Sequence, residues 1–210
     1  MTPRIKICGL TRREDLDAAV AAGADAIGLV FYPPSPRYVD LATAAALARA
    51  VPPFVSVVGL FVNADPATVR TTLAAVPLHV LQFHGDEDEA CCRQFERPYL
   101  KAARVRPGMT QADLVQYAAA FPSAQGILLD AFVEGYGGGG KTFDWSLVPP
   151  ILGAPLILSG GLDADNVGEA VRRIRPAAVD VSSGVEAAKG IKDAARMRAF
   201  VAAARAAADA

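Results

Sequence analysis

Residues 155–184 read PLILSGGLDADNVGEAVRRIRPAAVDVSSG, and this stretch decides the fold. It contains two short apolar runs, 155–160 and 177–184, and each run ends in a turn with glycine. An amphipathic segment, VGEAVRRI (167–174), lies between them. A strand whose two faces are both covered is apolar throughout rather than alternating in polarity. The stretch therefore predicts a strand–helix–strand unit of a parallel sheet.

The same pattern recurs along the whole chain. Longer helix-like segments separate the apolar runs, for example 13–23, 40–51, 65–76, 110–121 and 193–208. The predicted strands are IKICGL (5–10), AIGLVFY (26–32), VSVVGLFV (55–62), HVLQFH (79–84), YLKAARV (99–105), GILLDA (126–131), PLILSG (155–160) and AAVDVSSG (177–184). Strands that alternate with helices predict an α/β protein with a mainly parallel sheet.

Eight such units in 210 residues fit a single (βα)8 TIM barrel with short loops, spanning residues 1–210 as one domain. A doubly wound open sheet is the main structural alternative, since periodicity alone does not separate the two. Several helices start at capping residues. Thr11 and Glu14 have the spacing of a capping box, and Asp165 and Asn166 precede another helix.

Composition excludes several classes of protein. The net charge of −1 gives no overall basic field for nucleic acid, and no apolar stretch reaches the ~18 residues of a membrane span. Three cysteines cannot all pair, and Cys91 and Cys92 are adjacent, so we expect free thiols and a cytoplasmic location without a signal peptide. We interpret one of Cys91 and Cys92 as a core residue and the other as partly exposed. The sequence does not decide between a monomer and a homodimer.

Glycine turns follow the last two predicted strands. They contain Gly160 and Gly161 in one turn, and Ser183 and Gly184 in the other. Backbone N–H groups in such turns bind anions, and barrels often hold phosphate after strands seven and eight. A tight turn with no ligand is the alternative for each. GYGGGGKT (135–142) fits the letters of a P-loop but lacks its strand–loop–helix context, so we do not predict a nucleotide site there.

Candidate catalytic groups end several strands. Cys8 ends the first and Asp130 the sixth, and a thiol and a carboxyl facing each other can divide proton transfer. Cys8 needs a nearby cation, dipole or ligand to favour its thiolate. His84 also falls at a strand end. Arg37 is either a solvated loop cation or a bidentate clamp on a carboxylate. No cluster has metal-ligand spacing, so no metal is expected.

These segments together resemble the phosphoribosylanthranilate isomerase family, in family order from residue 6 to about residue 193. Each motif is moderately specific, and eight in order are highly specific. The motifs are KICGLT (6–11), FYP (31–33) with SPRY (35–38), GLFVN (59–63), QFHG (82–85), LLD (128–130), GKTFDW (140–145), LSGGL (158–162) and VDVSSGVE (179–186).

The resemblance implies an Amadori rearrangement of N-(5-phosphoribosyl)anthranilate in tryptophan biosynthesis, with no cofactor. It implies that Asp130 is the general acid and Cys8 the general base. Arg37 matches the residue near the anthranilate carboxylate, and His84 and Asp180 match residues that line or orient the substrate. Gly160, Gly161, Ser183 and Gly184 fall in the turns that hold phosphate.

Two positions depart from the family pattern. Gly139 stands where the family usually has Ser or Thr, which predicts a looser loop or weaker binding. Phe83 replaces an aliphatic residue before His-Gly, which predicts a tighter barrel wall.

Two other functions stay open at this point. One is another phosphate-binding barrel enzyme, such as a lyase or an indole-glycerol-phosphate synthase. Such a synthase is expected to carry catalytic Lys and Glu at strand ends, whereas Lys101 lies within the fifth predicted strand. The other is a barrel that binds a phosphorylated ligand without catalysis, although the presence of both Cys8 and Asp130 argues against it. Acceptance of a second phosphoribosyl substrate, from histidine biosynthesis, also stays open.

Overall fold

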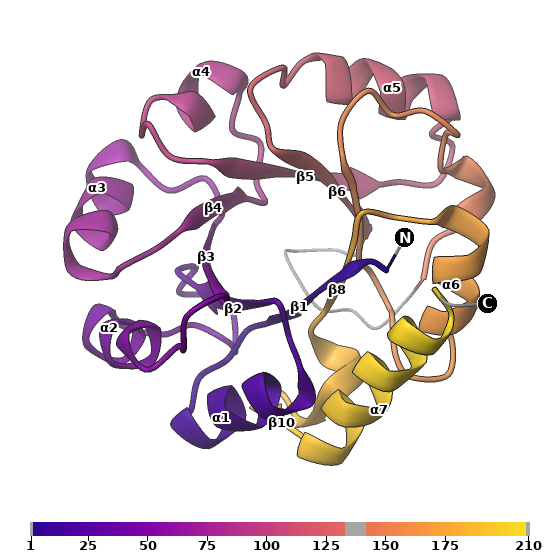
Figure 1. The fold of residues 1–210 in the computed structure, drawn as a ribbon. Coiled ribbons are helices and arrows are strands. Elements are labelled where there is room, and N and C mark those ends of the chain that lie inside the picture. The colour runs from indigo at the N-terminus through magenta and orange to yellow at the C-terminus, as the bar shows by residue number, and fades with distance from the viewer. Residues whose placement is uncertain (1, 133–141, 209–210) are drawn as a thin grey trace.

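A computed structural model describes residues 2–132 and 142–208. Eight parallel strands form a closed barrel in chain order, and β1 pairs with β8 to close it (Figure 1). This closure confirms the (βα)8 barrel and excludes the doubly wound sheet. The strands are β1 (Arg4–Cys8), β2 (Ala26–Val30), β3 (Ser56–Phe61), β4 (Val80–Phe83), β5 (Tyr99–Val105), β6 (Gly126–Ala131), β7 (Leu156–Leu158) and β8 (Ala178–Val181).

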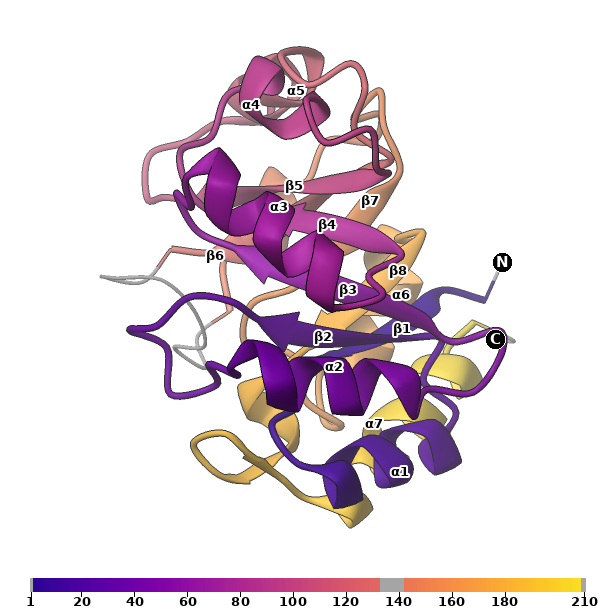
Figure 2. The same ribbon diagram turned by 90° about the vertical axis from the view of Figure 1, so that its left-hand side faces the viewer.

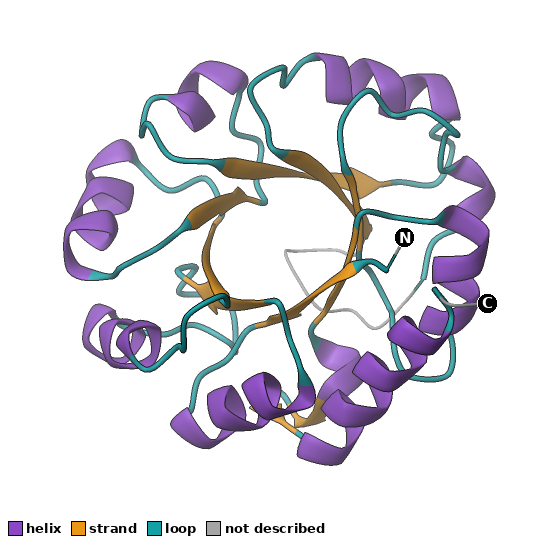
Figure 3. Cartoon of the chain, in the orientation of Figure 1, coloured by secondary structure: helices purple, strands orange, loops and turns teal. Residues whose placement is uncertain are grey.

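Helices surround the barrel on its outside (Figures 2 and 3). Between β6 and β7 the described residues contain only a 3₁₀ turn, η1 (Trp145–Leu147). After β8 a second 3₁₀ turn, η2 (Ser183–Val185), leads into a small hairpin of β9 (Glu186–Ala188) and β10 (Ile191–Lys192). The α-helices are α1 (Arg13–Ala22), α2 (Leu41–Arg49), α3 (Pro66–Ala75), α4 (Glu89–Arg93), α5 (Gln111–Ala119), α6 (Val167–Ile174) and α7 (Ala194–Ala206).

Two of the predicted helix caps are wrong. The residue before α1 is Arg12, and its side chain makes no capping bond, because the Thr11 hydroxyl donates instead to the carbonyl of Gly190 at 2.7 Å. Asn166 precedes α6 but its side chain also does not cap it, since its Oδ1 accepts from the backbone N–H of Asp163. A complete capping box does occur at α5, formed by Thr110 and Asp113.

Alternation along the strands separates two apolar regions. Ile5 and Ile7 of β1 face the helices and belong to the large outer core, as do the corresponding residues of the other strands. Ala102, Leu128 and Ile157 form a separate small cluster inside the barrel. Few apolar residues fill the inside, so the inward positions of β1, β4 and β8 are free to carry polar groups.

A row of aromatic rings reinforces the outer core behind β3, β4 and β5. Phe83 lies within it, with ring centroids 5.8 Å from Phe95, 5.9 Å from Tyr99 and 6.2 Å from Phe61. Its side chain faces the helices and is almost fully buried. Cys92 is buried and Cys91 is partly exposed, as predicted.

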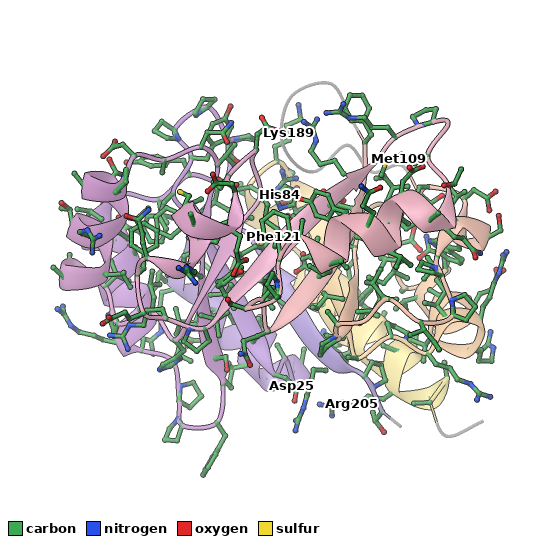
Figure 4. The ribbon with its side chains drawn as sticks, turned by 90° about the horizontal axis from the view of Figure 1, so that it is seen from above. Asp25, His84, Met109, Phe121, Lys189 and Arg205 are labelled. Atoms are coloured by element: carbon green, nitrogen blue, oxygen red, sulfur yellow. The ribbon has the colours of Figure 1, made fainter. Side chains whose placement is uncertain are left out.

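The two ends of the barrel carry different groups (Figure 4). His84, Met109 and Lys189 lie toward the end where the strands finish, and Asp25 and Arg205 lie toward the other. There Asp25 accepts hydrogen bonds from Arg4 and from the backbone of Ile5, both at 2.9 Å. Contacts at that end fasten strands to loops, while the carboxyl ends of the strands form the mouth where barrels place their chemistry.

Candidate active site

Four of the predicted site residues sit at the carboxyl ends of strands and surround the mouth of the barrel. Cys8 is the last residue of β1, His84 follows β4, Asp130 is near the end of β6, and Asp180 lies within β8. All four share the inward-facing parity of their strands, and three are less than 9% exposed. The Asp130 side chain is 13% exposed, so its carboxylate is open to the mouth.

His84 and Asp130 are in direct contact across the mouth. Nε2 of His84 lies 3.0 Å from Oδ2 of Asp130, and Nδ1 lies 3.0 Å from Nε2 of Gln82. The Gln82 amide donates to Nδ1 in this arrangement, so the ring proton sits on Nε2 and is donated to Asp130. Only Oδ1 of Asp130 then faces a ligand. A methyl group built on Gly160 would lie 2.9 Å from this Oδ1, so the missing side chain keeps space open beside it.

Cys8 lies in a closely packed pocket on the other side of the mouth. A methyl group built on Gly28 would lie 2.7 Å from its sulfur, and the hydroxyl of Ser182 donates to its carbonyl at 3.1 Å. Burial raises the pKa of the Cys8 thiol, while the charges of Lys6 and Lys192 act in the opposite direction. The net pKa lies above the ordinary thiol value, so the resting group is mainly protonated at neutral pH.

A buried chain of polar groups lies beneath Cys8. Lys6 Nζ donates to Oδ1 of Asp180 at 2.7 Å, and Ser159 Oγ donates to Oδ2 at 3.2 Å. Both oxygens of Asp180 therefore already accept hydrogen bonds. Burial lowers the pKa of Lys6, but the charges of Asp180 and Cys8 more than offset it, so the pKa lies above its ordinary value and the ammonium is charged.

Arg37 is not a solvated loop cation, since it is only 6% exposed. Its Nε and Nη2 donate to the two oxygens of Glu186 at 2.7 and 2.8 Å, and Lys192 Nζ donates to the same carboxylate at 2.9 Å. Gly9 makes room for this side chain, because a methyl group there would lie 2.5 Å from Arg37 Cδ. One edge of the guanidinium is thus fixed to the protein, and Nη1 is left for a ligand.

The two predicted phosphate turns touch each other. Gly160 and Gly161 follow β7 with φ values of 83° and 65°, which glycine adopts most readily. A methyl group on Gly184, in η2, would lie 2.0 Å from the carbonyl oxygen of Leu162. Only glycine allows this contact, so the turns after β7 and β8 pack into one continuous backbone surface, with Ser183 beside it.

Some predicted features lie elsewhere. The four-glycine run with Gly139, and most of the P-loop-like pattern, lie outside the described residues. Lys101 is fully buried on the outer side of β5, where it contacts Glu87 at 2.9 Å and the carbonyl of Gly85 at 2.6 Å. Its side chain therefore points away from the mouth and cannot act there as a catalytic lysine. Among the described residues no group of three His, Cys, Asp or Glu side chains could hold a metal ion.

Three further charged residues at the mouth, Lys6, Arg104 and Lys192, were not predicted as site residues from the sequence. Arg104 pairs in register with Asp130, and its guanidinium carbon lies 4.6 Å from the centre of the Phe132 ring. With Gly85 and Tyr117, among others, Arg104 lines a cavity of about 630 Å³. Counting back two residues from Cys8 places Lys6 on its inward face, and this parity was the available signal.

Comparison with known proteins identifies the family. The family model of N-(5'-phosphoribosyl)anthranilate (PRA) isomerase matches residues 5–203. This chain belongs to that family. An N-(5'-phosphoribosyl)anthranilate isomerase from Dechloromonas aromatica is 69% identical over 205 residues, which cover 98% of this chain and 97% of the relative. One from Pseudomonas aeruginosa strain LESB58 is 64% identical over 203 residues, covering 96% and 95%.

Solved structures of the isomerase family have the same fold. A phosphoribosyl anthranilate isomerase from Thermotoga maritima aligns with a TM-score of 0.89 at 41% identity, covering 97% of this chain and 99% of that one. Another, in complex with reduced 1-(o-carboxyphenylamino)-1-deoxyribulose 5-phosphate, aligns with a TM-score of 0.85 at 38% identity over 97% and 99%. Since the family is one of isomerases, the synthase and binding-only alternatives lose their support. No helix among the described residues is long and apolar enough to span a membrane.

Proposed function

We propose that this protein converts N-(5-phosphoribosyl)anthranilate to 1-(2-carboxyphenylamino)-1-deoxyribulose 5-phosphate, without a cofactor, as a step of tryptophan biosynthesis. The observation that carries the proposal is the placement of Cys8 and Asp130 at the ends of β1 and β6, on separate sides of one mouth. The ligand named for the solved relative is the reduced form of this product. The three free cysteines agree with a cytoplasmic enzyme.

Proton transfer begins at Asp130 in this proposal. Oδ2 is held by His84, so Oδ1 gives its proton to the ribose ring oxygen as the C1′–O bond breaks. The nitrogen lone pair forms the C1′=N bond, which yields an open-chain Schiff base with a new hydroxyl group. His84 fixes the direction of the Asp130 carboxyl throughout.

The second transfer uses Cys8, whose thiol first loses its proton to solvent. The positive Schiff base acidifies the C2′–H bond, and the Cys8 thiolate takes this proton while the electron pair moves to form C1′=C2′. The resulting enol loses its hydroxyl proton and gains one at C1′, which gives the ketone. Asp130 has then lost a proton and Cys8 has gained one, so both exchange with solvent before the next turnover.

Substrate binding involves both sides of the mouth. The phosphate is held by the backbone surface of Gly160, Gly161, Ser183 and Gly184. Nη1 of Arg37 binds the anthranilate carboxylate, because Glu186 already holds the other edge of the guanidinium. Asp180 acts through Lys6 and Ser159, whose groups occupy both of its oxygens.

Turnover of freshly prepared phosphoribosylanthranilate, followed by the loss of anthranilate fluorescence, tests this function. We expect turnover by the wild type and a loss of roughly 10²–10⁴-fold in Cys8→Ser and in Asp130→Asn. Full activity in Cys8→Ser would contradict the assignment of the base. A folded wild type that binds phosphate but does not turn over this substrate would contradict the reaction.

We infer that the protein is a homodimer. The isomerase from Thermotoga maritima is described as dimeric, and the structure of monomers generated from it aligns with this chain with a TM-score of 0.85. The side chain of Phe54, in the loop between α2 and β3, is fully exposed, and an interface that covers it would remove this apolar surface from water. Light scattering is expected to give a dimer mass for the wild type and a monomer mass for Phe54→Ser. A monomeric wild type contradicts the inference.

A further inference from the structure

Lys6 is a buried cation that the reaction steps above leave unused. It is two residues before Cys8 on β1, so both side chains point into the barrel. Its side chain is 5% exposed, and its ammonium group lies 2.7 Å from Asp180 on β8. Removing a lysine from water in this way is costly, which makes a purely incidental position a poor explanation.

The charged groups that face Cys8 come from three strands. Lys6 on its own strand and Lys192 on β10 are positive, and Asp180 on β8 is negative. The neighbouring strand β2 presents Gly28, which has no side chain to contribute. Burial raises the pKa of Cys8, Lys6 lowers it by charge and by hydrogen bonding, and Asp180 raises it. Lys6 is therefore the main group that favours the thiolate.

We propose that Lys6 is a positioning residue for the base: its ammonium group, fixed by Asp180, stabilises the thiolate of Cys8. This inference rests on the proposed function only in naming Cys8 as the base. The ammonium lies 2.7 Å from Asp180, and Lys6 shares the inward face of β1 with Cys8, so it acts on the reaction through Cys8 and not on the substrate.

Asp180 makes this arrangement work in both protonation states. While Cys8 is a thiolate, Lys6 balances two anions. Once the thiol has taken a proton from the substrate, Lys6 remains paired with Asp180, which Ser159 holds in place. Neither Lys6 nor Asp180 is left without a partner at either stage, so the proton transfer avoids the cost of an isolated buried ion.

Alkylation of Cys8 by iodoacetamide across a range of pH tests the proposal without any substrate. The variants are Lys6→Gln, which keeps a hydrogen-bond donor but no charge, and Asp180→Asn, which removes the anion but keeps the cation. All proteins carry Cys91→Ser, and Cys8→Ser provides the blank. Cys92 is buried in the core, and burial raises its pKa to about 12, so it contributes little.

The two variants are expected to shift in opposite directions. Loss of a nearby opposite charge raises a thiol pKa by about one unit or more, so Lys6→Gln slows alkylation at pH 8 at least about tenfold. Asp180→Asn speeds it. If Lys6→Gln does not fold, the neutral pair Lys6→Gln/Asp180→Asn replaces it and is also expected to react more slowly than the wild type.

The outcomes separate this inference from the proposed function. The role of Lys6 is overturned if the pH midpoint of Cys8 alkylation is unchanged in the Lys6 variants. It is also overturned if the midpoints of both single variants shift in the same direction, whatever substrate the enzyme turns over. A shift of opposite sign in the two single variants supports that role even when phosphoribosylanthranilate is not a substrate. Where turnover occurs, the acid limb of kcat/KM in Lys6→Gln should move to higher pH together with the alkylation midpoint.

Discussion

Replacing Glu186 by Gln is expected to destabilise the protein strongly and to weaken substrate binding. The carboxylate accepts three hydrogen bonds, from Nε and Nη2 of Arg37 and from Nζ of Lys192, at 2.7 to 2.9 Å. The side chains of these three residues are 6%, 7% and 0% exposed. The substitution keeps the shape of the side chain but leaves two buried cations with no anion between them.

The size of the effect follows from this burial. Breaking a buried ion pair by neutralising one partner costs about 3–5 kcal/mol. For a chain of this length, each kcal/mol lowers Tm by about 2–4 °C, so the expected loss is roughly 6–20 °C. KM should rise more than kcat falls, because Arg37 loses the contact that aims its free edge at the substrate carboxylate.

Thermal unfolding by circular dichroism measures the first effect and steady-state kinetics the second. Glu169→Gln on α6 is the matched control, since its partner Arg173 lies 4.0 Å away and the two side chains are 65% and 50% exposed. That change should lower Tm by less than about 2 °C. A Tm for Glu186→Gln that equals the control would refute the reasoning, because the buried carboxylate would then contribute no more than a surface charge.

Three further outcomes are expected. Gly160→Ala should lower kcat/KM at least tenfold, because its new methyl group would lie 2.4 Å from the backbone nitrogen of Ala131 and 2.9 Å from Asp130 Oδ1 and would displace the end of β6 that carries the acid. Gly153→Ala, with a similar φ of 82° and no neighbour within 4 Å, should lower only Tm. Equal activity of the two variants contradicts this. Thr110→Ala should cost about 1 kcal/mol of unfolding free energy, measured by urea titration, through loss of the α5 capping box. Burial raises the pKa of Glu186, but Arg37 and Lys192 bring it below its ordinary value. The ionised Glu186 carboxylate therefore contributes its full stabilisation of the fold above about pH 4.3, and this contribution is lost as the pH falls further. The Tm measured against pH should fall less steeply in Glu186→Gln than in the wild type.

The strands could be predicted from the sequence because their signal is local. GILLDA (126–131) coincides with β6, and YLKAARV (99–105) with β5. A parallel strand that is covered on both faces is mostly apolar, and this composition is visible in any short window. The order of eight such windows predicted a parallel α/β protein and favoured the barrel, but it did not exclude a doubly wound open sheet, which the pairing of β1 with β8 excludes.

Contacts between distant residues could not be predicted in this way. The capping box at Thr11 was wrong because the hydroxyl finds a carbonyl 179 residues later in the chain. Arg37 was singled out, but its partner Glu186 is 149 residues away and no local pattern joins them. Lys6 needed only the alternation of β1, yet its importance appears only when Asp180 of the last barrel strand lies beside it.

The closure of the barrel by β1 and β8 has a consequence for synthesis of the chain. The contacts of Lys6 with Asp180 and of Ser182 with Cys8 both join residues 174 positions apart. During translation, at about 5–20 residues per second, the first strand leaves the ribosome many seconds before its partner exists. Asp180 and Glu186, the partners of Lys6 and Arg37 in the folded protein, are not yet synthesised during that interval. A truncated chain that ends before β8 therefore lacks a complete mouth, even if its first strands assemble. The active site is completed only when the last barrel strand is added.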